Sequence, residues 1–361
     1  MWKIRKAGGG IMVGMCEDKE LFSKFANVVM DAREDNEARD NWHKQRLTSL
    51  GGSEIACVLG QSTYGSAYTV FQDKMGIAEP FSGNKFTRFG ISLEPIIRDW
   101  VQNDFEESTG IELKTEEYPF MMISKEIPFL SANIDGLAKM NKDYEYYRND
   151  DTGEIKTILA NELIGIEIKT AGEFMKDQWA DEVLPSAYYC QCLQYLFVTG
   201  LKHFLIVYLI GRDVKWKVIS RDEEDIKVLK ETAIQFWNNN ILLKIPPAPT
   251  GIEADTKAIL YNQDLEGDTE QEISDNKLTK YQEISDQLKV LGKEKERIKQ
   301  LIYLDLENNK KGTDGNYKVS RFEVKKDKVD LKLLKEKHSE IYKEVYKGQT
   351  EFVSMRITKC K

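Results

Sequence analysis

The sequence has few of the residues that build disulfide frameworks and zinc sites. Its 361 residues include only five cysteines and three histidines. Cys190 and Cys192 form a C-x-C pair with no second pair, and the histidines are scattered along the chain. Neither a disulfide framework nor a structural zinc site is therefore favoured. We expect reduced, partly buried thiols in a reducing compartment.

Long hydrophobic runs are also missing. No run of about eighteen apolar residues, the length needed for a transmembrane helix, occurs in the sequence. The first residues carry positive charge but no apolar stretch of the length found in signal peptides. We therefore expect a cytoplasmic protein.

Overall positive charge, the usual mark of a nucleic-acid partner, is absent. The net charge is −8, but it is unevenly distributed. From Asp275 onward there are 22 Lys and Arg against 15 Asp and Glu, so residues 1–274 carry a net charge of −15. Such an acidic body suits DNA only if a metal neutralises its carboxylates and positive charge lines a local groove.

Apolar spacing and turn residues predict a mixed α/β fold, with helices flanking a central run of mostly sequential strands. One or two amphipathic helices are expected over 20–50. A short helix with Ser53 as its N-cap is expected up to Gly60. The longer helices are predicted over 89–105 (with Glu94 near its start), 184–198 and 223–243. The strands are predicted over 118–123, 129–138, 163–170, 203–210 and 214–220, with a polar hairpin tip or loop at 140–160.

The chain is expected to contain one large domain and a small appendage. Residues 1–19 are predicted to be a disordered extension, 20–249 the main domain, and 250–275 an acidic, polar linker. Residues 276–361 are predicted to form a basic α-β-α-β appendage. Its elements are expected over 276–307, 315–324, 329–347 and 351–357.

The residues that suggest chemistry lie in the predicted strands. Side chains two apart in a strand share a face, so Glu167 and Lys169 project together while Ile166 and Ile168 face the core. Asp135 ends an earlier strand, where strand pairing would bring it beside Glu167. Two carboxylates and the Ile168 carbonyl would make an oxygen-rich site suited to Mg²⁺.

Such a site is suited to phosphodiester hydrolysis, because the metal neutralises the phosphate, activates a water and stabilises the departing oxygen. Lys169 would orient or deprotonate that water, and Glu94 would contribute a third carboxylate. The E-x-K spacing alone has a plainer explanation, since alternating charge is common on the solvated face of a half-exposed strand.

The motifs taken together are more specific. The order of Asp135, the E-x-K strand, the preceding Glu94 and the following glutamine-bearing helix resembles the nuclease superfamily named for its Pro-Asp…Asp/Glu-x-Lys motif, PD-(D/E)XK. Here Asn133-Ile134 stands where the proline often lies. This resemblance implies a restriction-endonuclease-like core.

A closer resemblance covers roughly residues 40–245 and is to the phage-type alkaline exonucleases of the YqaJ viral recombinase family, which includes the lambda exonuclease. It is carried by Arg46 with Leu47-Thr-Ser-Leu-Gly-Gly-Ser-Glu-Ile-Ala-Cys-Val-Leu-Gly60, Phe89-Gly-Ile-Ser-Leu-Glu-Pro95, Ser131-Ala-Asn-Ile-Asp-Gly136, Ile166-Glu-Ile-Lys-Thr170 and Ser186-Ala-Tyr-Tyr-Cys-Gln-Cys-Leu-Gln-Tyr195.

The resemblance assigns roles to four further residues. It implies that Arg46 and Ser53 bind the 5′-terminal phosphate of a duplex, and that Tyr188 and Gln191 line the catalytic site, with Gln191 supporting the lysine and the nucleophile. Without the resemblance, Ser53 and Arg46 would be a plain N-cap and a surface arginine. Gln191 would be an ordinary polar residue on a helix face.

The function that the resemblance implies is a Mg²⁺-dependent double-strand 5′-to-3′ exonuclease, with Mn²⁺ expected to substitute. It would leave a 3′ strand for a single-strand annealing protein, act as a ring-shaped homotrimer, and work in a bacterial host that carries the phage or prophage. Two alternatives stay open: an endonuclease or nuclease of other polarity with the same metal site, and a non-catalytic DNA-end-binding scaffold. The basic residues 276–361 would contact DNA or the annealing partner, or would simply be solvated.

Overall fold

The computed structural model describes residues 17–31, 44–80, 83–172, 179, 184–263, 267, 269–325 and 329–346. The chain divides into two compact units, Met1–Gln263 and Asp264–Lys361. The extension expected over 1–19 lies, except for its last three residues, outside the described residues. Within the described ranges, no helix combines the length and apolarity that crossing a membrane requires.

A five-stranded mixed sheet organises the first unit. Its order is β10-β9-β8-β5-β2, and only β8 and β9 run parallel. The strands are β2 (Leu113–Glu116), β5 (Gly136–Met140), β8 (Ile164–Ala171), β9 (His203–Ile210) and β10 (Asp213–Ser220). This sheet and its flanking helices confirm the predicted mixed α/β class.

Two smaller sheets accompany the central sheet. The first has the order β1-β3-β4 and contains β1 (Ala26–Asp31), β3 (Phe120–Ser124) and β4 (Ser131–Ala132). The second is the hairpin β6 (Tyr144–Asn149) and β7 (Glu154–Ile158), which confirms the expected hairpin over 140–160.

The helices expected over 20–50 were wrong for residues 26–31, which form strand β1. Antiparallel pairing with β3 decides the conformation there. Because tertiary pairing commonly overrides local propensity, the helical spacing of Leu21, Phe25 and Val28 was misleading.

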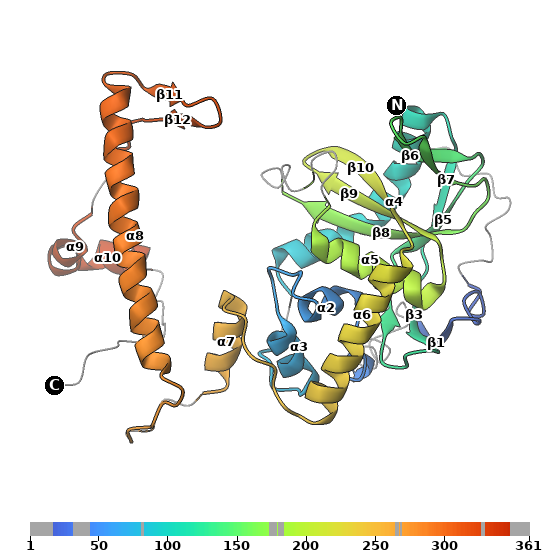
Figure 1. Ribbon diagram of the computed structural model, residues 1–361, viewed down its shortest axis with the longest axis horizontal. Coiled ribbons are helices and arrows are strands. Elements are labelled where there is room, and N and C mark those ends of the chain that lie inside the picture. Colours follow the sequence, from blue (N-terminus) through green and yellow to red (C-terminus); the bar gives the residue numbers. More distant parts are fainter. Residues whose placement is uncertain are drawn as a thin grey trace. The chain divides into compact units, whose positions relative to one another are not determined.

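Helices cover both faces of the central sheet. They are α2 (Gly52–Val58), α3 (Ala67–Lys74), α4 (Lys85–Thr109), α5 (Ser186–Thr199), α6 (Glu223–Phe236), the π-helix η2 (Trp237–Leu242) and α7 (Glu253–Tyr261). The helices α2, α3, α5 and α6 pack together beside the sheet, whereas α4 packs against β2, β8, β9 and β10 (Figure 1). The helices predicted over 89–105, 184–198 and 223–243 correspond to α4, α5, and α6 with η2.

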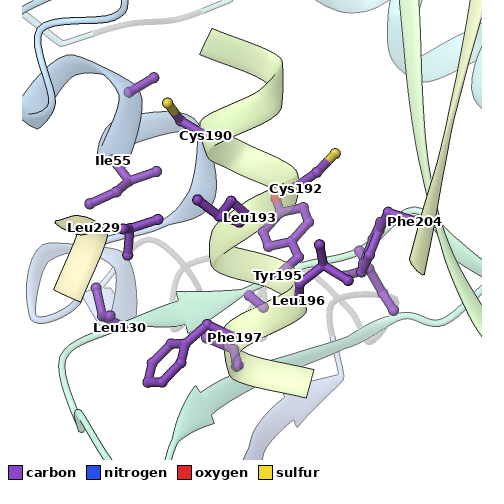
Figure 2. Close-up of a cluster of buried hydrophobic side chains, with 14 of the residues drawn as sticks. Ile55, Leu130, Cys190, Cys192, Leu193, Tyr195, Leu196, Phe197, Phe204 and Leu229 are labelled. Atoms are coloured by element: carbon purple, nitrogen blue, oxygen red, sulfur yellow. The ribbon is translucent and has the colours of Figure 1, made fainter. Parts of the chain in front are cut away.

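The core has two parts, one on each face of the sheet. In β8, Ile166 and Ile168 join the part that includes Ile97 and Val101 of α4. On the opposite face, α5 buries Leu193 among side chains that include Ile55, and Tyr195 lies beside Phe204, with ring centroids 5.8 Å apart (Figure 2). The face of β8 opposite Ile166 and Ile168 is therefore the face covered by α5.

The expected linker over 250–275 begins with structure that belongs to the first unit. Residues 253–261 form α7, and its Asp255 is buried. The Asp255 carboxylate accepts hydrogen bonds from the Ser66 hydroxyl and, at 2.6 Å, from the Thr250 backbone N–H. These buried bonds fix α7 at the N-terminus of α3.

The second unit contains α8 (Lys277–Leu306), the hairpin β11 (Lys311–Thr313) and β12 (Lys318–Ser320), α9 (Leu331–Lys337) and α10 (Ser339–Val345). The long helix over 276–307 is confirmed. The single strand expected over 315–324 is one half of a hairpin, and the helix expected over 329–347 is interrupted at His338. The strand expected over 351–357 lies outside the described residues.

Candidate functional site

The pairing of β5 with β8 brings Asp135 to Glu167. Gly136 is the partner of Ile166 in the antiparallel register, so Asp135 lies at the end of the ladder beside Glu167. The Asp135 N–H donates to the Ile166 carbonyl at 3.1 Å, and the Ile168 N–H donates to Asp135 Oδ2 at 2.6 Å. The strand backbone thus positions both the main chain and the side chain of Asp135.

Glu167 is the most enclosed carboxylate of the site, with only 2% of its surface exposed. Its Oε1 accepts hydrogen bonds from Lys169 Nζ at 2.5 Å and from Gln191 Nε2 at 2.6 Å. Gln191 Nε2 is also 2.9 Å from the Tyr195 hydroxyl. Strand β8 and helix α5 therefore fix one oxygen of Glu167 in place.

These residues line one cavity of about 370 Å³. Its walls come from the segment around α2, from α4, from the β4–β5 connection, from β8 and from α5. The lining residues are Arg46, Gly51, Gly52, Ser53, Gly90, Glu94, Ser131, Asn133, Asp135, Glu167, Ile168, Lys169, Thr170, Gln191 and Tyr195. Of the twelve distinct side chains, the sequence had singled out all but Ser131, Asn133, Thr170 and Tyr195 as site residues.

The carboxylates of the cavity hold protons unusually tightly. Burial and the neighbouring Asp135 raise the pKa of Glu167 to about 8. Burial and Asp135 likewise raise the pKa of Glu94 to about 7, and burial raises that of Asp135. Burial opposes the charge on Lys169, but Glu167 and Asp135 outweigh it and raise the lysine pKa. The metal-free cavity thus has more carboxylates than it has positive charge to balance.

A divalent cation fits this arrangement. Glu167 Oε2 is buried and, in the described part of the chain, has no hydrogen-bond partner, which leaves a costly unsatisfied acceptor in the cavity. Among the described residues no three His, Cys, Asp or Glu side chains gather closely enough to hold a metal. The protein ligands that fit are therefore Asp135, Glu167 and the Ile168 carbonyl, with the remaining positions left to water and phosphate oxygens.

Glu94 lies in the first half of α4 and lines the same cavity. Its Oε1 is 2.6 Å from the guanidinium of Arg98, one helical turn further on. Arg98 thus holds Glu94 to the helix surface. The role of Glu94 as a third metal-binding carboxylate stays a prediction.

Arg46 and Ser53 do come together at the cavity, with Arg46 NH2 3.5 Å from the Ser53 hydroxyl. The expected capping role of Ser53 was wrong: Gly51 is the N-cap of α2, and Glu54 accepts from the Gly51 N–H at 2.7 Å. This leaves the Ser53 side chain in the first turn, where it is exposed. A guanidinium and a hydroxyl at a helix N-terminus suit an anion.

Two residues of this pocket were not predicted as part of the site. Glu54 Oε1 lies 3.0 Å from Arg46 and 2.7 Å from Lys74, whose side chain is fully buried. Burial opposes the charge on Glu54, but Lys74 and Arg46 outweigh it and lower the Glu54 pKa. Glu54, three residues after the N-cap, follows the capping-box spacing and could have been found from the sequence. Lys74 lies 20 residues from its partner, and no local pattern indicates it.

Tyr188 lies next to Lys169 but does not line the cavity described above. Lys169 Nζ is 5.1 Å from the centroid of its ring, and Trp179 stacks on it at 5.3 Å. Tyr188, Lys169 and Gln191 instead line an adjoining cavity. The role of Tyr188 in binding DNA stays a prediction.

Comparison with known proteins agrees with the resemblance seen in the sequence. Residues 41–202 match the family described as the YqaJ-like viral recombinase domain. The uncharacterized protein YqaJ of Bacillus subtilis (strain 168) is 26% identical over 341 residues, which cover 92% of this chain and 97% of that protein.

Solved structures give partial matches. An alkaline exonuclease (LHK-Exo) from Laribacter hongkongensis is 17% identical with a TM-score of 0.40, covering 55% of this chain and 91% of that one. A phage-related exonuclease from Haemophilus somnus 129PT is 13% identical with a TM-score of 0.33, covering 54% of this chain and 96% of that one. These similarities extend over about half of the chain.

Proposed function

We propose a function from two observations: residues 41–202 match the YqaJ-like viral recombinase domain, and these residues include those that line the cavity described above. The protein is a Mg²⁺-dependent exonuclease that degrades one strand of duplex DNA in the 5′-to-3′ direction and leaves a 3′ single strand. The observation that carries this proposal is the placement of Asp135, Glu167 and Lys169 in the same cavity as Arg46 and Ser53.

Asp135, Glu167 and the Ile168 carbonyl would hold the metal, with Glu94 beside them. A bound Mg²⁺ supplies charge neutralisation of the phosphate, a more acidic water and stabilisation of the departing 3′ oxygen. Mn²⁺, which accepts similar oxygen ligands, is expected to substitute for it.

The side chains of the chain itself position the reactants. Lys169 is 2.5 Å from Glu167, and its raised pKa keeps it charged in the metal-free cavity. A charged lysine donates hydrogen bonds, so orienting the attacking water fits it better than deprotonating that water. Gln191 donates to Glu167 and holds the carboxylate against rotation.

Arg46 and Ser53 would bind the 5′-terminal phosphate. Glu54 cancels part of the positive charge of Arg46 and Lys74, so two cations share this one bridging carboxylate. A doubly charged terminal phosphate gains more from such a pocket than a singly charged internal diester does. Only an enzyme that works from DNA ends needs this anchor.

The remaining parts of the proposal follow the family resemblance. A single-strand annealing protein would receive the 3′ strand, and a ring-shaped homotrimer would enclose the duplex. The basic residues 276–361 would contact DNA or that partner. The protein would act in the cytoplasm of a bacterium whose phage or prophage encodes it.

Digestion of linear duplex DNA tests the proposal. The substrates are a 5′-phosphorylated duplex, a 5′-hydroxyl duplex and a closed circle, each with and without Mg²⁺. We expect mononucleotides from the phosphorylated linear duplex only, and only with the metal. Glu167→Gln should reduce the rate by about 100-fold or more, because it removes a metal-binding carboxylate while keeping its size.

Glu154→Gln is the matched control, because Glu154 lies on the exposed hairpin strand β7. It should digest DNA at the wild-type rate. Cutting of the circle would contradict an end-dependent enzyme and favour an endonuclease. Binding of DNA ends without cleavage would favour a scaffold.

A further inference from the structure

A second cavity adjoins the catalytic cavity and has no part in the function proposed so far. It encloses about 400 Å³, within the range of small-ligand pockets. Ser53, Lys169 and Gln191 line both cavities, so these three side chains form the wall between them. The other lining residues are Glu54, Cys57, Ser62, Tyr64, Gly65, Thr69, Val70, Asp73, Ala187 and Tyr188.

The aromatic side chain of Tyr64 is the most accessible part of this wall. It is 75% exposed, although it lies beside well-packed residues. The neighbouring Gly65 is buried, and a Cβ there would lie 3.1 Å from Cys57 Sγ and 2.8 Å from the Thr69 hydroxyl oxygen. The backbone of the loop is therefore held against α2 and α3 while the Tyr64 ring projects from it.

Tyr188 lines the same cavity as Tyr64. Burial raises the pKa of the Tyr188 hydroxyl. Tyr188 already contacts Trp179 and Lys169 through its ring. Tyr64 is therefore the ring with a face to offer a ligand.

The charges of the wall decide which part of a nucleotide fits. Asp73, half exposed at 53%, and the ionised Glu54 both lie on this side. Carboxylates repel a second phosphate but tolerate a neutral, flat base that carries amino donors. Base stacking on an exposed aromatic ring is a common device of proteins that bind single-stranded DNA.

We propose that this second cavity is a nucleobase subsite, in which Tyr64 stacks on the base of the nucleotide whose phosphate lies in the catalytic cavity. The inference rests on the proposed nuclease function. It adds Tyr64 as the stacking partner of that base.

A binding measurement tests the subsite without requiring cleavage. Isothermal titration calorimetry in Ca²⁺ compares deoxycytidine 5′-monophosphate with deoxyribose 5-phosphate, which lacks the base. We expect the nucleotide to bind about tenfold more tightly, the lower part of the range for one stacked base. Tyr64→Ala should remove that difference, and Tyr64→Phe should keep it.

A kinetic measurement then tests the subsite during turnover. Single-turnover digestion of a 5′-phosphorylated duplex should be about tenfold slower in Tyr64→Ala and within about twofold of wild type in Tyr64→Phe. On a duplex whose first 5′ nucleotides are abasic, the wild type should digest more slowly than on the normal duplex. Tyr64→Ala should digest the abasic duplex at the same rate as the wild type does. Tyr147→Ala, an exposed tyrosine of the hairpin, is the matched control and should behave as wild type.

The outcomes separate the two proposals. Equal binding of nucleotide and sugar phosphate, or an equal slowing of normal and abasic ends by Tyr64→Ala, overturns the subsite even if the enzyme digests DNA. Absence of any cleavage by the wild type overturns the nuclease, whereas a Tyr64-dependent preference for the nucleotide would still support a base subsite. Because Tyr64 is exposed, we expect all its variants to keep the wild-type melting temperature.

Discussion

The two oxygens of Glu167 are in opposite situations. Oε1 has Lys169 and Gln191 as donors, whereas Oε2 is buried with no partner among the described residues. A protein retains such a group at a cost in stability, which a bound cation or a proton relieves. The cation and the proton compete for Glu167 Oε2, so the affinity of the site for the metal depends on pH.

This linkage gives a prediction for the stability of the metal-free protein. The Glu167 pKa rises from its ordinary value of 4.5 to about 8 on folding, so the folded chain binds more protons than the unfolded chain between these values. The free energy of unfolding should therefore fall as pH rises through this interval. Urea denaturation in EDTA at a series of pH values measures it.

Glu167→Gln should show a flatter pH dependence, because glutamine does not titrate. Mg²⁺ should reverse the trend in the wild type, since the metal binds the deprotonated carboxylates and becomes tighter as pH rises. The same slope in wild type and variant would show that Glu167 does not take up a proton on folding.

At the residue scale the sequence singled out Asp135, Glu167 and Lys169, which line one cavity, but not the groups that hold them; the catalytic roles of these residues stay predictions. Glu167 and Lys169 follow from the two-residue period of a strand, and Asp135 from its place at the end of another. Lys74 could not be found in this way, because its partner Glu54 lies 20 residues away in the sequence. Tyr195 lies one helical turn after its partner Gln191, but this spacing alone does not mark it as a residue of the cavity. Glu94 was predicted to face the metal, and its contact with Arg98 came only from the structure.

Between elements, β8 and β9 approach each other closely at Gly165. Gly165 is the register partner of Phe204, and a Cβ at Gly165 would lie 2.2 Å from that ring. Phe204 is fully buried and cannot move aside. Strand β8, which carries Glu167 and Lys169, can therefore lie this close to β9 only because residue 165 is a glycine.

Gly165→Ala should accordingly lower the free energy of unfolding by about 1–3 kcal/mol, the usual cost of an overpacked core. Urea denaturation measures the loss, and Mg²⁺-dependent digestion should fall with it because β8 is displaced. Phe204→Leu makes room for the added methyl group, so the double variant should lose less than the two single losses combined. Purely additive losses would show that the two side chains do not meet.

The sequence predicted most elements of the first unit because their apolar periods agree with their burial. Helix α4 shows this clearly, with Ile97, Val101 and Phe105 all fully buried at helical spacing. Strand β1 was missed because its conformation depends on pairing with β3, about 90 residues later, and a local pattern carries no record of such a partner.

On the scale of the whole molecule, the first unit is longer than its composition suggested. Residues 250–263 are polar, which predicted a linker, yet Asp255 is 1% exposed and bonds to Ser66 and Thr250. A single buried carboxylate with well-placed donors is enough to attach a polar helix. The composition of a segment is an average over its residues, so it does not reveal a single buried carboxylate.

Asp255→Ala in the full chain should therefore lower the free energy of unfolding by about 1–3 kcal/mol, because it leaves the buried Ser66 hydroxyl without its acceptor. Thermal and urea denaturation measure the change. Glu253→Ala is the control on the same helix. The Glu253 side chain is 80% exposed and pairs with Lys257 on the surface, so its loss should leave the free energy of unfolding close to that of the wild type.

The place of β8 in the sheet has a consequence for the synthesis of the protein. On one side β8 pairs with β5, which precedes it, but on the other side it pairs in parallel with β9, which follows only after the crossover helix α5. A growing chain that ends before His203 already contains Asp135, Glu167 and Lys169. It lacks the strand that fixes their support, and during translation the open edge of β8 needs protection from other chains. Ribosomes that stall in this interval would release a polypeptide that contains Asp135, Glu167 and Lys169 without the strand that completes the sheet beside them.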